Sequence, residues 1–581
     1  MKKFLSLVLA LVMTMSLVTV SAGAKDFTDD SEITYKEAVD VISALGVVDG
    51  YSDGDFRPDD VLTRGAAAKI ICNLILGPTT ASALSAGTAP FKDVPVTNTF
   101  AGYITYCSQQ GIISGYADGT FRPTGTLSGN AFMKMLLGAL GYDSSIEGYT
   151  GPNWTVSVIK QAVGIGLDDG NDEFVGSKAV TRQEAALYAF NMLQATMVEY
   201  DAKTTVNVNG ATVTVAGNKA QDKAWGTATN NDGNIDDDGF VQFAEQYFDK
   251  LTLRSVVDSF GRPSNRWANK GVEIGTYPKT AGASYTENVT LGTIYADLGM
   301  TDKDEKAEVY VDGVLASELA KVSKGNDAKI ADLKFAGTDK CSVGNGTLVE
   351  AYLDEDTNDV TIACINTYVA EVNKVVAASG NKDAYITLSD TTNEGRMPAK
   401  FSPSDEFETE GFESDDIVLF TYSNADEEIK SVVKAESVTG ALSKLVLTKS
   451  VSLGEETYKF SNKYGTEYGE GRLDVDSEYV VYLDDYGYAI YVEETEYNIA
   501  DYAFLRALQS GSVVFNTDKA ALVTYDGKTK TVDTTKDYLD GVINTYANNT
   551  EKQIGDAGAK IVVTKALEDG VCFDGSSIAG F

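Results

Sequence analysis

The sequence predicts a multidomain protein: an N-terminal all-α domain of three repeats, followed by several mainly-β domains that are barrel- or sandwich-like. At 581 residues the chain is too long for a single hydrophobic core, and typical domain sizes give about four to six domains. A nearly identical nine-residue segment occurs twice within the first quarter of the chain. Beyond residue 200, short β-branched runs separated by turn dipeptides replace the helical pattern.

The extreme N-terminus has the pattern of a secretory signal. Lys2 and Lys3 precede an apolar run that starts at Phe4, and Ala-Gly-Ala at 22–24 supplies the small residues that a signal peptidase accepts. We therefore expect residues 1–24 to be a signal peptide, with no membrane span once it is removed. Retention of the segment as an anchor is the alternative, and the polar residues that interrupt its apolar run argue against it.

The composition excludes several function classes. An excess of acidic residues, 85 against 48 basic ones, gives a net charge of −37, which repels nucleic acid and anionic lipid. The chain has no histidine, so Ser-His-Asp and Cys-His catalysis and His-ligated zinc are excluded. Its five cysteines include no Cys-x-x-Cys pair, which supports neither a disulfide framework nor a zinc ribbon, and we expect most of them to be small buried residues.

Internal repetition is the strongest signal in the chain. Residues 50–58 read Gly-Tyr-Ser-Asp-Gly-Asp-Phe-Arg-Pro, and residues 115–123 differ from them at two positions. A more divergent third copy follows, in which Phe174 precedes Thr181 by the same spacing as in the first copy. The three repeats are expected at residues 25–80, 88–145 and 146–200.

Each copy is predicted to be a helix, a glycine-containing loop and a second helix. In the first copy, residues 35–45 have amphipathic spacing that ends at Gly46, and Thr63 is placed to cap the next helix. In the third copy, Thr181 and Glu184 have the spacing of a capping box. A unit this small cannot bury its own apolar face, so we expect the three to pack together as one domain.

Three motifs together resemble the S-layer homology domain, over about residues 25–200. They are Phe-x-Asp-Val at 91–94, the Gly-Tyr-x-Asp-Gly-x-Phe-Arg-Pro loop, and Thr-Arg-x-Glu at 181–184. The resemblance implies a three-pronged helical assembly that binds secondary cell wall polysaccharide in its pyruvylated form, with the arginine facing an acidic ketal. Arginine suits this role because its planar fork pairs with a carboxylate through two hydrogen bonds. It also implies a secreted protein of the cell wall surface.

Carried over by position, the resemblance assigns polymer binding to Thr63, Arg64, Trp154, Thr181, Arg182 and Glu184. The second copy departs from the pattern with Ser-Gly-Asn-Ala at 128–131, which predicts that its groove has lost the charge, so we expect one or two working grooves. For Trp154, and for Phe100 in the second copy, packing in the core is the alternative to sugar stacking. Arg57 and Arg122 are expected to brace their loops.

The rest of the chain is predicted to be mainly β. Asn209-Gly210 between two β-branched runs predicts a hairpin, and Asp312-Gly313 and Asp526-Gly527 predict two more. A weaker repeat pairs apolar strands at 348–354, 417–422 and 479–484 with second strands at 360–362, 429–433 and 488–492. The expected segments are 201–285, with an acidic loop and a helix, and the β domains 286–364, 365–435, 436–495 and 496–581.

One acidic stretch has the spacing of a calcium-binding loop. Asn234, Asp236, Asp238 and Glu245 offer the hard oxygen ligands that calcium requires, and a helix is predicted at 241–253. The residues before the loop do not resemble an entering helix, so a solvated acidic loop is the alternative.

Two function classes stay open. In the first, the chain is a non-catalytic S-layer or S-layer-like protein without catalytic residues, whose β domains associate with other copies in a lattice. In the second, the anchor carries an adhesin or a carboxylate-dependent glycan hydrolase. The absence of histidine and of any catalytic constellation favours the first.

Overall fold

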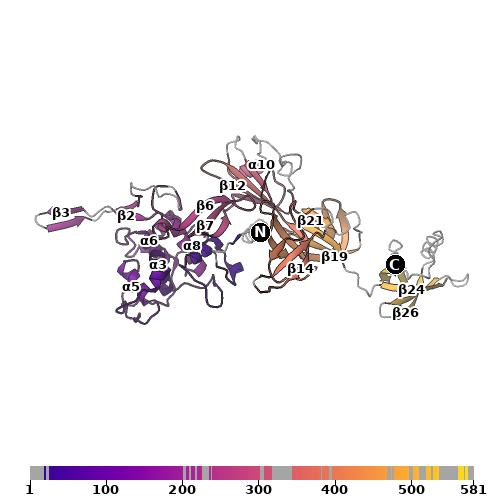
Figure 1. Ribbon diagram of the computed structural model, residues 1–581, viewed down its shortest axis with the longest axis horizontal. Coiled ribbons are helices and arrows are strands. Elements are labelled where there is room, and N and C mark those ends of the chain that lie inside the picture. Colours follow the sequence, from indigo (N-terminus) through magenta and orange to yellow (C-terminus); the bar gives the residue numbers. More distant parts are fainter. Residues whose placement is uncertain are drawn as a thin grey trace. The chain divides into compact units, whose positions relative to one another are not determined.

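Helices occupy the N-terminal third of the described chain and strands nearly all of the rest, as the computed structural model in Figure 1 shows. Two compact units divide the chain: residues 1–437, 444–473 and 481–491 form one, and residues 438–443, 474–480 and 492–581 the other. The described residues are 19–20, 25–200, 204–208, 211–215, 219–225, 235–236, 238–300, 307–316, 343–380, 382–391, 396–466, 473, 475, 477–495, 502–509, 518–524, 528–534, 560–567 and 570–573.

Three successive helix-loop-helix units make up the N-terminal region. Their helices are α2 (Lys36–Ala44) and α3 (Arg64–Leu76), then α5 (Ala101–Gln109) and α6 (Gly129–Leu140), then α7 (Trp154–Gly164) and α8 (Arg182–Gln194), with the short η1 (Asp30–Glu32) and α4 (Pro78–Ser82) beside the first pair. The Thr63 hydroxyl caps α3 by accepting the Ala66 N–H at 3.3 Å, and Thr181 and Glu184 form the predicted capping box of α8. The second helices therefore begin where the sequence places them.

A closed ring of backbone hydrogen bonds joins the three units. The N–H of Leu62 donates to the carbonyl of Val180 at 2.9 Å, that of Val180 to Leu127 at 2.9 Å, and that of Leu127 back to Leu62 at 3.1 Å. The second helix of each unit also packs on the first helix of the next, α3 on α5, α6 on α7 and α8 on α2. Because every unit completes its bonding on its neighbours, none of the three is an independent fold.

One hydrophobic core extends from the helices into the sheet that follows them. This sheet has the strand order β1-β8-β7-β6, with β1 (Thr19–Val20), β6 (Leu251–Val257), β7 (Pro263–Asn269) and β8 (Val272–Pro278). Trp267 of β7 is fully buried, its ring centroid lies 5.3 Å from that of Phe190 in α8, and its indole N–H donates to Glu37 of α2 at 2.7 Å. The sheet is therefore packed against the helical domain.

The helix predicted at 241–253 is wrong in its second half. Helix α9 (Phe243–Tyr247) ends after five residues, and β6 begins at Leu251. Phe243 enters the shared core at the helix start, whereas alternation of apolar and polar residues from Leu251 suits a strand that pairs with β7.

The predicted hairpin is confirmed as β3 (Thr204–Val208) and β4 (Ala211–Val215), with its turn outside the described residues. Strand β2 (Val198–Tyr200) pairs with β5 (Ala220–Asp222).

Two open five-stranded sheets come next. The first has the order β11-β10-β13-β12-β9, with β9 (Ala283–Tyr285), α10 (Leu291–Asp297), β10 (Ala307–Val311), β11 (Val314–Ala316), β12 (Thr347–Leu353) and β13 (Val360–Asn366). The second has the order β16-β15-β14-β17-β18, with β14 (Tyr368–Val376), β15 (Tyr385–Ser389), β16 (Glu406–Glu408), β17 (Ile417–Ser423) and β18 (Glu428–Lys434). Asp312 and Gly313 have φ of 47° and 85°, which fits the predicted two-residue turn between β10 and β11.

A closed barrel and a last sheet complete the described strands. The barrel has the order β19-β20-β21-β23-β22, with β19 (Glu436–Val446), β20 (Ser450–Leu453), β21 (Glu456–Thr466), β22 (Glu478–Leu483) and β23 (Ala489–Glu494). The last sheet has the order β26-β25-β24-β27-β28, with β24 (Tyr502–Gln509), β25 (Asp518–Thr524), β26 (Thr529–Thr534), β27 (Lys560–Leu567) and β28 (Gly570–Phe573). Strands β25 and β26 pair as the third predicted hairpin, whose Asp526-Gly527 turn lies outside the described residues.

The repeated strand pairs of the sequence are present as β12 with β13, β17 with β18, and β22 with β23. The third pair belongs to a barrel, as expected, whereas the first two belong to open sheets. In the stretches that the structure describes, no helix has the length and apolar character needed to cross a bilayer.

Candidate functional site

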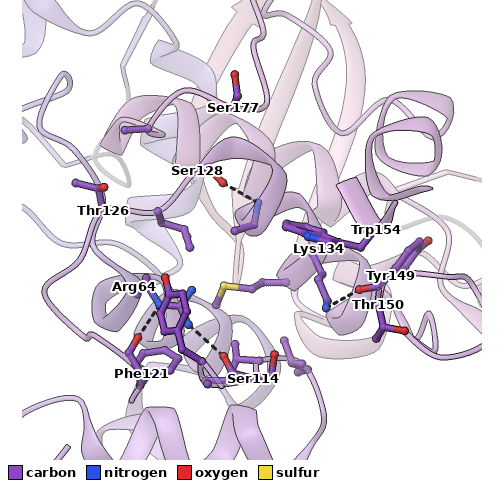
Figure 2. Close-up of a pocket in the computed structure, with 18 of the residues that line it drawn as sticks. Arg64, Ser114, Phe121, Thr126, Ser128, Lys134, Tyr149, Thr150, Trp154 and Ser177 are labelled. Carbon is purple, nitrogen blue, oxygen red and sulfur yellow. Dashed lines mark hydrogen bonds between the residues drawn. The ribbon is translucent and has the colours of Figure 1, made fainter. Parts of the chain in front are cut away.

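A groove of about 550 Å³ lies where the three helical units meet (Figure 2). The start of α3 contributes Arg64, the second loop contributes Ser114 and Tyr116, α6 contributes Lys134, and α7 contributes Trp154. The groove therefore exists only in the assembled domain, because each unit supplies one wall of it.

Arg64 is held in place at one side of this groove. Its Nε donates to the carbonyl of Phe121 at 2.8 Å and its Nη2 to that of Ser114 at 3.2 Å, while the guanidinium lies 4.4 Å from the centroid of the Phe121 ring. Burial lowers the pKa of Arg64 from its ordinary value, yet a guanidinium stays charged at any physiological pH. Nη1 is left over from these bonds and is available to a ligand.

Lys134 supplies a second cation across the groove (Figure 2). Its Nζ donates to the carbonyl of Tyr149 at 2.7 Å and lies 5.5 Å from the centroid of the Trp154 ring. Burial lowers the pKa of Lys134, and no carboxylate opposes that shift. Within the described residues neither Lys134 nor Arg64 forms an ion pair, so the groove favours an anionic ligand although the chain as a whole is strongly acidic.

The same arginine arrangement occurs at the first loop. Arg182 begins α8, its Nε donates to the carbonyl of Phe56 at 2.8 Å, and its Nη2 donates to that of Asp49 at 2.9 Å. Its guanidinium lies 4.8 Å from the centroids of both the Tyr51 and the Phe56 rings. Each second helix therefore presents its first residue to the loop of the following unit, and the third unit closes the cycle on the first.

This cyclic arrangement changes which groove lacks the charge. Gly129 begins α6 and faces the third loop, where an added Cβ would lie 3.0 Å from Cε2 of Phe174. The sequence-based interpretation, in which the second copy's own groove loses its charge, is therefore wrong, because the second loop receives Arg64 from the first unit. The pocket beside the third loop measures about 150 Å³ and has Glu173 and Glu184 in its lining.

Rigid loops support this arrangement. Asp29 accepts the N–H of Arg57 at 2.6 Å, and Asp93 accepts the N–H of Arg122 at 2.7 Å; each carboxylate also accepts the N–H of the preceding phenylalanine. Arg57 and Arg122 adopt left-handed φ of 55° and 59°, and their side chains pair with the aspartate four residues earlier. Both arginines thus brace their loops, as predicted, and offset the cost of the left-handed conformation.

Comparison with known proteins agrees with this architecture. Residues 26–68 and 90–129 match the family model of the S-layer homology domain. The resemblance predicted from the sequence is confirmed. The S-layer homology matches fall within the first two helical units and end near the start of α3 and of α6. The third unit is a proposal that rests on its capping box and its place in the hydrogen-bond ring.

Several surface proteins are similar to this chain. A surface layer protein of Brevibacillus choshinensis is 27% identical over 37% of this chain and 19% of its own length. A cellulosome-anchoring protein of Acetivibrio thermocellus is 39% identical over 13% of this chain and 16% of its own, and an endoglucanase of a Bacillus strain is 32% identical over 17% and 11%. The chain thus spans less than a fifth of the length of each of these three relatives. Together with the S-layer homology match, they indicate a secreted protein of the cell wall surface.

Only part of the predicted site lies in the groove. Arg64 and Trp154 line it, and Arg182 occupies the related position at the first loop. Thr63 and Thr181 cap helices, and Glu184 accepts the Thr181 N–H at 2.7 Å within the capping box. These three act first on local structure.

Lys134 was missed by the sequence reasoning. The signal that could have revealed it is a repeated lysine, because Lys69 and Lys134 follow the capping residues Thr63 and Ser128 by the same spacing. Each is the single lysine of a mainly apolar helix.

The acidic stretch does not form a metal cluster in the described residues. Asn234 lies outside them, and no group of three or more Asp, Glu, Cys or His side chains in the described stretches is placed to hold a metal ion. Glu245 instead accepts the N–H groups of Ile235 and Gln242 at 3.4 and 3.1 Å and caps α9. Asp238 accepts the Phe240 N–H at 2.8 Å. The calcium loop stays a prediction, because Asn234 lies outside the described residues, while Asp236 lies near Asp238 and Glu245.

Proposed function

We propose that the chain is a non-catalytic S-layer or S-layer-like protein held non-covalently to secondary cell wall polysaccharide through its helical units. The observation that carries the proposal is the groove in which Arg64 and Lys134 face open space without a carboxylate partner. Each cation is partly buried without an ion pair among the described residues, and an acidic sugar substituent could supply the missing counter-charge.

A pyruvate ketal fits the chemistry of this groove. Its carboxylate would accept a hydrogen bond from Nη1 of Arg64 or from Nζ of Lys134, and such a charged bond is stronger than one between neutral groups. The half-buried ring of Trp154 offers an apolar face for the sugar that carries the ketal. Arg182 at the first loop is the basis for a second, related groove, whereas the Gly129 position argues against a third.

The test is co-sedimentation of the full chain with purified wall sacculi, before and after hydrofluoric acid removes the secondary polymer. Lys134→Glu should weaken binding at least about tenfold, because it removes a charged hydrogen bond and places a carboxylate against the ligand's own. Lys160→Glu is the matched control, since Lys160 is exposed on α7 away from the groove lining. Equal binding by the two variants, or binding that survives the acid treatment, would contradict the proposal.

Arg64→Ala and Arg182→Ala belong in the same experiment with a folding check. Each arginine holds a neighbouring loop through two carbonyl oxygens, so its loss affects the fold as well as the ligand. Circular dichroism at the binding temperature separates the two effects.

For the β domains we propose self-association in a surface lattice. Electron microscopy of the purified chain on sacculi should show a periodic array. The alternative is an anchored adhesin or a carboxylate-dependent glycan hydrolase. In that case the Lys134→Glu chain, whose wall binding is weakened, would still bind or cleave a soluble glycan.

A further inference from the structure

Two cysteines meet in the centre of the helical domain. Cys72 of α3 and Cys107 of α5 are both fully buried, and their Sγ atoms lie 3.5 Å apart. The first helix belongs to the first unit and the second helix to the next, so the contact joins two units. Cys364, a third cysteine whose side chain the structure describes, is buried in the core of a separate sheet.

The surrounding contacts place the two sulfurs at the crossing point of the helices. The Cys72 thiol lies 3.5 Å from the carbonyl of Tyr103, one turn before Cys107, and the Cys107 thiol lies 3.6 Å from the carbonyl of Ala68, one turn before Cys72. This reciprocal arrangement requires the two backbones to approach each other closely at the cysteines. Side-chain rotation, with little backbone movement, can then bring the sulfurs to bonding distance.

The fold itself does not need cysteine at this crossing. The related positions are counted from the cap of each second helix and from the aromatic residue at the start of each first helix, which is Tyr35, Phe100 or Trp154. By this count Leu137 and Gln161 occupy the related crossing of α6 and α7. Phe190 and Ile42 occupy that of α8 and α2. Ordinary side chains therefore fill the two related positions, and the cysteine pair is particular to the contact between the first and second units.

We propose that Cys72 and Cys107 form a disulfide bond that links the first two helical units in the exported protein. Thiols outside the cytoplasm meet an oxidising environment. The reaction is thiol–disulfide exchange with a protein or low-molecular-weight disulfide of that compartment. One cysteine thiolate attacks that disulfide, forms a mixed disulfide with one of its sulfurs and releases the other. The second cysteine thiolate then attacks the first cysteine's sulfur in the mixed disulfide, which forms the Cys72–Cys107 bond and releases the rest of the oxidant, so that the oxidant leaves as two thiols. The two S–H protons pass to the thiolates released, so the protein loses two hydrogens and the oxidant gains them.

Burial sets the time at which the bond forms. The contact with Cys107 and its own burial raise the pKa of Cys72, and in the folded domain both sulfurs are shielded from an external disulfide. Exchange therefore takes place while α3 and α5 are still assembling, and once the helices close the bond is shielded from reductants.

The test uses the full chain purified from the exporting cell. It is unfolded without reductant, its thiols are alkylated, and its peptides are mapped by mass spectrometry. We expect unmodified Cys72 and Cys107 in one linked peptide pair, two mass units lighter than the separate peptides. Complete alkylation of both residues, or linkage of either to another cysteine, would overturn the proposal.

Stability provides a second readout. Protein that is refolded in reductant should melt about 10 °C lower than the oxidised protein. The disulfide closes a loop between cysteines 35 positions apart, and its loss increases the conformational entropy of the unfolded chain. The Cys72→Ala/Cys107→Ala variant should show no such difference, and Cys364→Ala should keep it. A difference that persists in the double variant would also overturn the proposal.

Discussion

Replacement of Trp267 by alanine tests whether the sheet β6–β8 is part of the wall anchor. Trp267 lies far along the sequence from the S-layer homology units, yet it is fully buried against Phe190 and donates to Glu37. Removing an aromatic side chain from a core costs about 3–5 kcal/mol. Burial raises the pKa of Glu37. When the indole donor is removed, protonation of the Glu37 carboxylate reduces the free-energy cost, so we expect a loss in the lower half of that range.

The assay is native-state hydrogen exchange of the full chain, read on peptides from α2 and α8. A loss of about 3 kcal/mol should increase their opening equilibrium by roughly two powers of ten. Phe420→Ala is the matched control, because Phe420 is equally buried in the separate core of β14–β18 and should leave α2 and α8 unchanged. Unchanged protection of α2 and α8 in Trp267→Ala would refute the shared core.

Further predictions concern the loops and one buried carboxyl. Arg182→Ala should lower the urea midpoint of the helical domain by an amount worth about 2–4 kcal/mol, because Arg182 links two units through two carbonyl oxygens. Arg57→Ala should change the midpoint much less, because its ion pair with Asp53 is exposed to solvent, and equal effects of the two variants would contradict the role of Arg182. Asp93→Ala should cost about 2–3 kcal/mol by leaving two loop N–H groups without their acceptor, measured in the same titration, and a change within error would refute it. Burial raises the pKa of Asp484 to about 7, so its contribution to stability is fully present below about pH 4 and is lost as pH rises through about 7. In the wild-type chain, hydrogen-exchange protection of β22 and β23 should therefore decrease between pH 5 and 8, and in Asp484→Asn it should decrease less. The same dependence of protection on pH in both chains would contradict this.

Local signals in the sequence predicted the local structure well. Thr63, Thr181 and Glu184 cap helices as their spacing indicated, because capping depends on residues within one turn. The Asp312-Gly313 turn followed in the same way from its need for positive φ.

Contacts between units could not be read from the same signals. Repeat alignment shows that Gly129 replaces an arginine, but not that a second helix serves the loop of the next unit. Likewise, nothing in the mainly polar sequence of β7 reveals that Trp267 enters the helical core. Periodicity tells which face of an element is apolar, and the identity of its partner depends on the assembled chain.

The hydrogen-bond ring of Leu62, Leu127 and Val180 also orders events during export. A chain that crosses the membrane from its N-terminus presents the first unit, then the second, and the last bonds of the ring form only after Val180 has emerged. Until then the first loop lacks its hydrogen bonds from Arg182. The helical domain is thus completed at a single late step, when enough of the chain has emerged to close the ring of hydrogen bonds.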